Sequence, residues 1–342
     1  MALRIGLVGY GVGGRMFHAP YIRASQACEL VGIVARAPGT VASAATDHPE
    51  AAIHSSLPEM VNAGIDAVVI STPPATRRAL VLEAVGRGVP VIADKPFAPS
   101  AAAGRKLVAA ANEAGVLLNV FHNRRFDSDI VTAKAVTASG ALGRITRLDL
   151  RCDQDDRATL EAGPDGGLLR DLGSHVVDQA LFLRGPARAV SAHMDWVDLP
   201  AGRTDSGFVI TITHADGSHS HVSSSKINHL VSRELRLHGD RGSYASDYSD
   251  VQFEALRAGR TPAEDREHWG YESAERWGTL AVDGERRAVP SLQGDYAAFY
   301  DAFAAAAIDG GEGPVPGREG VAVLEVLDAA RASAMEGRVV EL

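Results

Sequence analysis

The chain has 342 residues, of which 46% are hydrophobic and 23% charged, and this length is ample for about two domains with a real core. Its formal net charge of −9 argues against a nucleic-acid partner, because nucleic-acid phosphates would repel the protein. No apolar run is long enough to span a bilayer and no signal peptide precedes the first predicted strand, so we expect a cytoplasmic protein without a membrane partner.

The first predicted strand, residues 3–8, runs directly into Gly9-x-Gly11-x-x-Gly14. This pattern is typical of a strand that leads into a helix, here predicted over residues 13–25, through a phosphate-binding turn. Gly9 permits the tight turn, Gly11 lets the backbone approach a pyrophosphate, and Gly14 allows the helix to pack closely. The unpaired N–H groups at the helix N-terminus attract the anion. We therefore predict that a dinucleotide is bound by Gly9, Tyr10, Gly11, Val12, Gly13 and Gly14.

The segments that follow alternate between apolar strands and helices as far as Phe121. Strands are predicted over residues 30–35, 67–71, 89–93 and 116–121. Helices are predicted around residues 41–46, from residue 75 onward, and over residues 101–112 after Ser100 as N-cap. Strands that are apolar throughout indicate a parallel sheet covered by helices on both faces. We expect an α/β fold in which residues 1–121 form a doubly wound, dinucleotide-binding Rossmann domain.

The pattern changes in the second part of the chain, residues 122–342. Polar and apolar residues alternate over 147–152 and again over 234–238, as in half-buried strands. Asp216-Gly217 lies between two further strand-like runs and is a hairpin signal. We therefore expect a second α/β domain with a largely antiparallel sheet, and a final helix over residues 321–335 that could pack back on the first domain.

The end of the second predicted strand bears on the choice of cofactor. An acidic residue there accepts hydrogen bonds from the ribose hydroxyls in NAD-binding folds. Here the strand ends in Val34-Ala35-Arg36, without a carboxylate. The Arg36 guanidinium would pair with a 2′-phosphate, and no acid repels it. We expect NADP as the cofactor, with NAD as the alternative if Arg36 is only a solvated surface residue.

A candidate catalytic lysine follows the strand predicted over residues 89–93, in Asp94-Lys95-Pro96. Ligands of open α/β sheets bind beyond the carboxyl ends of the strands, so the topology places Lys95 at a binding cleft. Pro96 restricts the backbone directly after it. The alternative is a surface lysine in a turn.

A candidate proton-transfer unit lies in a helix predicted over residues 168–183. Asp171, His175 and Asp178 are spaced i, i+4 and i+7, so they share one helix face. Neighbouring carboxylates favour the imidazolium form of a histidine and orient its ring. The alternative is a helix-surface histidine with ordinary i, i+4 partners.

Together these motifs resemble the Gfo/Idh/MocA family of NAD(P)-dependent oxidoreductases. The resemblance covers nearly the whole chain and rests on the glycine turn, Thr72-Pro73, Asp94-Lys95-Pro96 and Asp171-x-x-x-His175-x-x-Asp178. Residues 123–127 and 166–179 are similar in particular to the branch of NADP-dependent scyllo-inositol dehydrogenases. The resemblance implies a Rossmann domain followed by a domain with an open sheet, which binds the substrate and often mediates homo-oligomers.

The resemblance also implies roles for individual residues. The lysine, aspartate and histidine of the family's catalytic set correspond to Lys95, Asp171 and His175. The positions that reach the substrate in relatives correspond to Asn123 and Arg124. Besides the glycine turn and Arg36, the expected cofactor contacts are Thr72, Pro73 and Lys95.

The sequence departs from the family pattern at two places. Relatives usually carry Glu before the lysine, and the shorter Asp94 here would shift Lys95 slightly. Relatives often have Asn and then His after Thr-Pro, where this chain has Pro74 and Arg77, so the contacts near the nicotinamide would differ. Neither change removes a proton-transfer residue.

We therefore expect an enzyme that transfers a hydride between NADP and a secondary alcohol or ketone of a polyol, inositol or sugar. His175 would act as the general base, Lys95 would stabilise the developing charge on oxygen, and Asp171 would fix the geometry. A reductase of another carbonyl or imine is one alternative, because this fold accepts many substrates. A non-catalytic NAD(P)-binding sensor is another, although a sensor need not keep these groups. His219 and His221 lack acidic or cysteine partners, so we predict no metal site.

Overall fold

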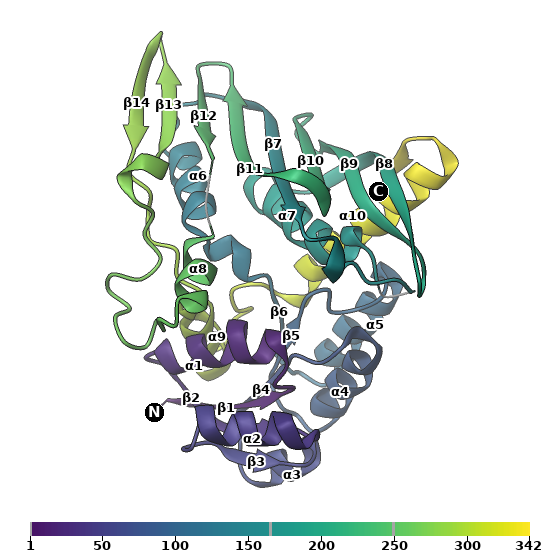
Figure 1. The fold of residues 1–342 in the computed structure, drawn as a ribbon, viewed down its shortest axis with the longest axis vertical. Helices are drawn as coiled ribbons and strands as arrows, with labels where there is room; N and C mark the ends of the chain where they lie inside the picture. The colour runs from purple at the N-terminus through teal and green to yellow at the C-terminus, as the bar shows by residue number, and fades with distance from the viewer. Residues whose placement is uncertain (1, 164–165, 248–249) are drawn as a thin grey trace. The chain divides into compact units, whose positions relative to one another are not determined.

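The computed structural model describes residues 2–163, 166–247 and 250–342, which form two compact units (Figure 1). The first unit contains Met1–Asn123, Phe253–Trp269 and Asp295–Val321. The second unit contains Arg124–Gln252, Gly270–Gly294 and Ala322–Leu342. Each unit is therefore assembled from three separate segments of the chain.

The first unit contains the predicted doubly wound parallel sheet. Its strands are β1 (Leu3–Val8), β2 (Cys28–Val34), β3 (Ala52–His54), β4 (Ala67–Ile70), β5 (Val91–Asp94) and β6 (Leu118–Phe121). They are arranged in the order β3-β2-β1-β4-β5-β6, and every neighbouring pair is parallel. All residues of β4 and β6 are buried, as the continuous apolar runs indicated. The strand order reverses between β1 and β4, where ligands of such sheets bind.

Helices connect these strands, and several were predicted from capping and proline signals. The helices between the strands are α2 (Pro38–Asp47), α3 (Leu57–Asn62), α4 (Pro74–Gly86) and α5 (Ala101–Glu113). Ser100 caps α5 as predicted, because its hydroxyl accepts a hydrogen bond from the Ala103 N–H at 3.2 Å. The sequence analysis missed β3 and α3, since both are short and only partly buried. Farther along the chain lie α8 (Val251–Arg257) and α9 (Ala297–Asp309).

The helix predicted over residues 13–25 has an irregular first half. It begins as a π-helix, η1 (Gly13–His18), and continues as α1 (Ala19–Ala24). Pro20 has no N–H to donate, and its ring would clash with the carbonyl four residues earlier in a regular α-helix. The wider turn ahead of Pro20, in which the Ala19 N–H bonds to the Gly14 carbonyl, relieves that conflict.

The second unit contains an open, mostly antiparallel sheet, as predicted. Its strands are β7 (Ile145–Asp155), β8 (Ala187–Leu199), β9 (Gly202–His214), β10 (His219–Ser225), β11 (Ile227–Gly239), β12 (Gly242–Ser246), β13 (Gly278–Val282), β14 (Glu285–Val289) and β15 (Val340–Glu341). The order is β14-β13-β12-β11-β7-β10-β9-β8-β15, and only β10 and β7 pair in parallel. The predicted hairpin joins β9 to β10, and Gly217 in its turn has φ +83°.

One face of this second sheet is packed and the other is polar. Helix α7 (Leu168–Arg184) contacts β7, β9 and β10, and α6 (Ser128–Ala138) contacts α7. On β7, Leu148 and Leu150 are buried, whereas Arg147 and Arg151 on the opposite face are exposed. The predicted final helix lies within α10 (Gly317–Glu336).

The short helical turns are η2 (Asn123–Phe126), η3 (Arg157–Thr159) and η4 (Ala274–Arg276). Cys28 and Cys152 are both buried, and neither forms a disulfide. In the described residues, no helix combines the length and the apolar character that crossing a bilayer requires.

Candidate active site

The glycine turn lies at the carboxyl end of β1, and its glycines serve different purposes. Gly9 has φ +100°, and a Cβ atom there would lie 2.3 Å from the Ser71 carbonyl oxygen. A Cβ on Gly14 would lie 2.1 Å from the Gly9 carbonyl oxygen. A Cβ on Gly11 would meet no atom within 4 Å. The chain itself therefore requires Gly9 and Gly14, while Gly11 leaves the open space that a pyrophosphate needs.

The turn contains two residues with side chains: Tyr10, which is buried, and Val12, which is exposed to solvent. Tyr10 is buried, and its hydroxyl donates to Asp47 Oδ2 at 2.8 Å. Burial and this hydrogen bond raise the pKa of the Tyr10 phenol. Arg15 also pairs with Asp47, at 2.9 Å. Val12, in contrast, is 74% exposed, so only its backbone is suited to a phosphate. Tyr10 thus anchors the turn to the end of α2.

Arg36 is exposed two residues beyond the end of β2. In the parts of the chain that the structure describes, no ion pair or hydrogen bond of its guanidinium is found. The residues from Val34 to Arg36 include no carboxylate. The end of β2 therefore offers a cation and no competing acid to a ligand phosphate.

The turn that carries Lys95 is braced by the aspartate before it. Asp94 Oδ1 accepts a hydrogen bond from the Lys95 N–H at 2.8 Å, and Asp94 Oδ2 accepts one from the Ser71 hydroxyl at 3.0 Å. Burial by itself would raise the pKa of the Asp94 carboxyl. The nearby His18 ring, with the charges of Arg77 and Lys95, outweighs burial and holds that pKa below its usual range. The shorter acid at this position is thus ionised and holds the backbone of the turn.

A buried histidine, which the sequence analysis missed, stands behind Asp94. His18 Nε2 lies 3.6 Å from Asp94 Oδ2, and His18 Nδ1 lies 2.7 Å from the Tyr300 hydroxyl. Both His18 and Tyr300 are fully buried, and the His18 ring packs 4.2 Å from the Phe121 ring. His18 follows the glycine turn in the sequence, but no local pattern connects it to a tyrosine 282 residues away.

Arg77 joins the loops after two neighbouring strands. It is buried, and its guanidinium donates to the Thr72 carbonyl oxygen at 2.6 Å and to the Pro96 carbonyl oxygen at 2.5 Å. Pro74 is the first residue of α4, where a proline fits because no helical N–H is needed there. The departures from the family pattern at Pro74 and Arg77 therefore brace the loops that carry Thr72-Pro73 and Lys95.

The second unit provides helix α7, whose start is fixed by a strand residue. Gly167 precedes the helix with φ +97°, and a Cβ there would lie 2.2 Å from Asp205 Oδ1. Asp205 Oδ2 accepts a hydrogen bond from the Leu169 N–H at 2.6 Å, which satisfies one unpaired donor of the first turn. Arg331 pairs with the same aspartate at 3.3 Å. Asp205 therefore caps α7 in place of a residue of the helix itself.

Asp171 and His175 lie one turn apart on α7, as predicted. Asp171 Oδ2 accepts a hydrogen bond from Lys226 Nζ at 2.7 Å. The Asp171 side chain is 45% exposed, whereas that of Lys226 is 6% exposed. His175 is buried, with 9% of its surface exposed. The sequence analysis did not identify Lys226, because no spacing rule relates a strand-end lysine to this helix.

The remaining predicted residues make contacts of their own. Asp178 is buried and accepts hydrogen bonds from Arg125, with Nε at 2.9 Å and Nη2 at 2.6 Å. Arg124 pairs with Asp127 at 3.2 Å and with Asp250 at 2.7 Å. Asn123 is 6% exposed at the start of η2. The structure thus gives Asp178 a buried arginine partner and holds the Arg124 guanidinium between two carboxylates.

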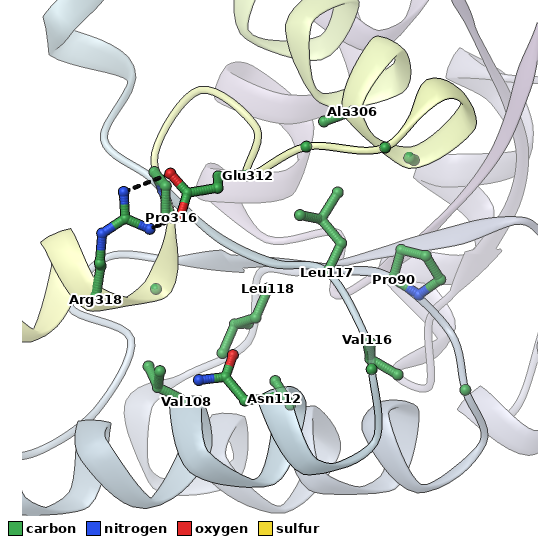
Figure 2. Close-up of a pocket in the computed structure, with 17 residues that line it drawn as sticks. Pro90, Val108, Asn112, Val116, Leu117, Leu118, Ala306, Glu312, Pro316 and Arg318 are labelled. Carbon is green, nitrogen blue, oxygen red and sulfur yellow. Dashed lines mark hydrogen bonds and ion pairs between the residues drawn. The ribbon is translucent and has the colours of Figure 1, made fainter.

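A pocket of about 700 Å³ in the first unit lies at the other edge of the parallel sheet. Figure 2 shows Pro90 and Leu117, which precede β5 and β6, lining it together with Ala306 and the ion pair between Glu312 and Arg318. Ligands of this fold bind at the carboxyl ends of the strands, where Gly11 and Lys95 lie. We therefore do not assign the cofactor to this pocket. Among the described residues, no group of three or more His, Cys, Asp or Glu is arranged to hold a metal ion.

Comparison with known proteins gives consistent similarity along the whole chain. Residues 3–122 match the model of an oxidoreductase family with an NAD-binding Rossmann fold, and residues 130–245 match the Gfo/Idh/MocA C-terminal domain. The chain is 34% identical to the uncharacterized oxidoreductase YdgJ of Escherichia coli K12, over 95% of this chain and 94% of that protein. It is 30% identical to the scyllo-inositol 2-dehydrogenase (NADP+) IolW of Bacillus subtilis 168, over 99% of this chain and 96% of IolW.

The fold is also that of a solved relative. The structure of yvaA from Bacillus subtilis superposes with a TM-score of 0.91 and 30% sequence identity, covering all of both chains. Matches of this length and identity, to both domain models and to full-length relatives, leave no part of the fold unaccounted for. The chain belongs to the Gfo/Idh/MocA family of NAD(P)-binding oxidoreductases.

Proposed function

We propose that the protein is an NADP-dependent dehydrogenase that acts on a secondary alcohol, or the matching ketone, of an inositol, another polyol or a sugar. The observation that supports this most strongly is that the chain keeps a complete proton-handling set in ordered surroundings. Lys95 follows a braced turn at the end of β5, and Asp171 and His175 share one face of α7. Full-length similarity to IolW, whose name states an NADP-dependent scyllo-inositol dehydrogenase, supports the substrate class.

In this proposal each residue has a separate task in the reaction. His175 accepts the hydroxyl proton of the substrate as the hydride leaves the carbon. Lys95 donates a hydrogen bond to the same oxygen and stabilises the negative charge that develops there. Asp171 orients His175 or a second substrate hydroxyl. The hydride acceptor is the chemistry that a bound nicotinamide supplies.

The preference for NADP over NAD is supported by the end of β2. Arg36 is exposed there, and the residues from Val34 to Arg36 include no carboxylate. The Gly11 backbone faces open space, so the chain has room for the pyrophosphate next to the start of η1. We propose that the residues from Gly9 to Gly14 hold the pyrophosphate and that Arg36 pairs with the 2′-phosphate.

The substrate class and the assembly state are the parts of the proposal with the most direct alternatives. A reductase of another carbonyl or imine would use the same lysine and histidine, because the fold accepts many substrates. A sensor without turnover would have no need for Asp171 and His175.

The exposed polar face of the second sheet, with Arg147 and Arg151 on it, would serve a homo-oligomer. Cys28 and Cys152, which form no disulfide, fit a reducing compartment such as the cytoplasm.

The test is steady-state formation of NADPH with a panel of inositols and aldoses, run beside NAD and beside the Lys95→Ala variant. Turnover of a polyol with NADP that is lost in the variant would support the proposal. If no polyol or sugar is turned over while NADPH still binds, the dehydrogenase assignment is wrong. That result would favour a reductase of another carbonyl or imine, or a sensor without turnover.

A further inference from the structure

Lys226 is a buried lysine outside the set that the family resemblance identified. It lies in the short connection between β10 and β11, and only 5% of its surface is exposed. The sheet holds its backbone on both sides. The Lys226 N–H donates to the Ser206 carbonyl oxygen at 3.0 Å, and the Lys226 carbonyl oxygen accepts from the Asp156 N–H at 3.1 Å. The root of the side chain is therefore fixed, and a buried ammonium at this place needs a partner.

That partner is the predicted catalytic aspartate. In the part of the chain that the structure describes, the Lys226 ammonium makes one hydrogen bond, to Asp171 Oδ2 at 2.7 Å. The cation is buried, but the carboxylate is 45% exposed. An exposed carboxylate by itself samples several rotamers, and a charge-assisted hydrogen bond from a fixed cation restricts it to one. The ion pair thus restrains the Asp171 carboxylate through Oδ2 and leaves part of this side chain exposed to solvent.

A second ion pair on the same helix shows a different design. Arg125 and Asp178 have side chains that are 5% and 1% exposed, so both partners are closed off from solvent. This pair joins η2, which carries Arg125, to α7. The Lys226–Asp171 pair instead joins an enclosed cation to a carboxylate that a substrate can reach. Asp171 is also one helical turn from His175.

We propose that Lys226 is a positioning residue for the reaction. It acts through Asp171, by holding that carboxylate in the orientation in which it stands beside His175 on α7. This inference rests on the proposed function for the identity of the reaction, but the coupling of Lys226 to Asp171 and His175 is a property of the second unit that can be measured without turnover.

The first test is a kinetic cycle with Lys226→Met and Asp171→Asn. Lys226→Met keeps the aliphatic length and removes the charge, and kcat should fall about 10- to 100-fold with little change in KM or in NADPH affinity. Lys226→Arg should restore part of the loss. In the Asp171→Asn background, Lys226→Met should lower kcat by less than about twofold, because the residue through which it acts is already altered. Losses that multiply fully in the double variant would overturn the inference.

The second test does not depend on finding a substrate. The histidine ring signals of isotope-labelled protein are recorded by NMR, and the His175 signal is identified by its loss in His175→Gln. That signal should shift in Lys226→Met, return toward its original position in Lys226→Arg, and stay in place in Arg125→Lys, the matched control on the other ion pair. An unchanged His175 signal in Lys226→Met overturns the inference even if the enzyme oxidises polyols.

The two tests also separate this inference from the proposed function. If the wild-type protein turns over no polyol or sugar but the His175 signal responds as expected, the proposed function fails and the positioning role stands. Should Lys226→Met fail to fold, Lys226→Gln takes its place, since it keeps a hydrogen-bond donor and removes the charge.

Discussion

Two aspartates, one in each unit, have carboxyl groups whose pKa values are shifted in opposite directions. Asp94 lies beside Lys95, with a side chain that is 17% exposed. Burial disfavours its charge, but the cations around it reverse the balance and hold the pKa of its carboxyl below the usual range. The Asp94 carboxylate also accepts hydrogen bonds from the Lys95 backbone N–H and the Ser71 hydroxyl. Asp94 is therefore charged and fully bonded.

Asp129, near the start of α6, is the opposite case. It is 2% exposed, and no hydrogen bond of normal geometry reaches either of its carboxyl oxygens from the described residues. Burial, and then the negative charges of Asp127 and Glu272, raise the pKa of the Asp129 carboxyl well above its ordinary value. Both causes favour the protonated form of the Asp129 carboxyl.

The comparison shows that burial alone does not decide the charge of a carboxyl group. Burial is the first cause at both sites and raises the pKa at both. The difference lies in the sign of the neighbouring charges, which are cationic beside the candidate catalytic lysine and anionic beside α6. A charged, braced aspartate suits a turn that must hold Lys95 in place, whereas burial among acidic neighbours favours the uncharged form of Asp129.

The largest expected effect is a loss of activity without a loss of stability when the Lys95 side chain is removed. Lys95→Ala should lower kcat/KM about 10²- to 10³-fold, because it removes the donor to the reacting oxygen. The free energy of unfolding should change by less than about 0.5 kcal/mol, since Asp94 keeps its bonds to the backbone N–H and to Ser71. Kinetics with the best polyol, together with urea denaturation, measure both. A large loss of stability would mean that Lys95 itself holds the turn.

The next largest effect is expected when Arg77, one of the cations near Asp94, is replaced. Arg77→Met should lower the free energy of unfolding by about 1–2 kcal/mol, because it leaves the part-buried carbonyl groups of Thr72 and Pro96 without their donor. It should also lower kcat, since the loop with Lys95 loses its link to the loop after β4. Urea denaturation at pH 7 tests this, with Arg78→Met on the same helix as a control that should be nearly silent. Equal stability of the two variants would contradict the bracing role.

A smaller effect concerns Asp129 and its dependence on pH. The pKa of this carboxyl is higher in the folded protein than its unfolded value of about 4, so its contribution to stability is complete below that value. As pH rises toward the folded pKa, unfolding releases a proton, and stability declines by up to about 1.4 kcal/mol per pH unit.

Asp129→Asn, which keeps the shape of the neutral side chain, should remove this decline and so be relatively more stable at pH 8 than at pH 5. Denaturation midpoints measured from pH 4 to pH 9 compare the two proteins. The Asp94 carboxyl has the opposite sign, because its lowered pKa stabilises the fold above about pH 4 and the benefit is lost below it. Parallel pH profiles for wild type and Asp129→Asn would disprove the raised pKa of the Asp129 carboxyl.

The smallest effect lies outside both regions and tests the cofactor preference. Arg36→Glu should weaken NADPH binding about tenfold, because an exposed cation is replaced by an acid facing the 2′-phosphate. Binding of NADH should be unchanged or stronger, since the new carboxylate can accept hydrogen bonds from the ribose. Fluorescence titration with both cofactors measures the ratio. An unaltered ratio would mean that Arg36 is a solvated surface residue.

Much of the fold follows from local patterns in the sequence. Continuous apolar runs predicted β1, β4 and β6, because strands buried on both faces have no polar side. The glycine spacing predicted the turn, and the spacing of Asp171 and His175 predicted their common helix face. Short elements such as β3 and α3 were missed, since a few half-buried residues carry too little periodicity.

The partners of the charged residues were decided only by the tertiary structure. Tyr300 lies 282 residues from His18, Lys226 lies 55 residues from Asp171, and Arg125, which bonds to Asp178, lies 53 residues from it. Periodicity determines which face of an element a side chain occupies, and the sequence by itself determined those faces and the two kinds of sheet. Which distant charge meets that side chain depends on strand order and packing, and these set the ionised state of Asp94 and the orientation of Asp171.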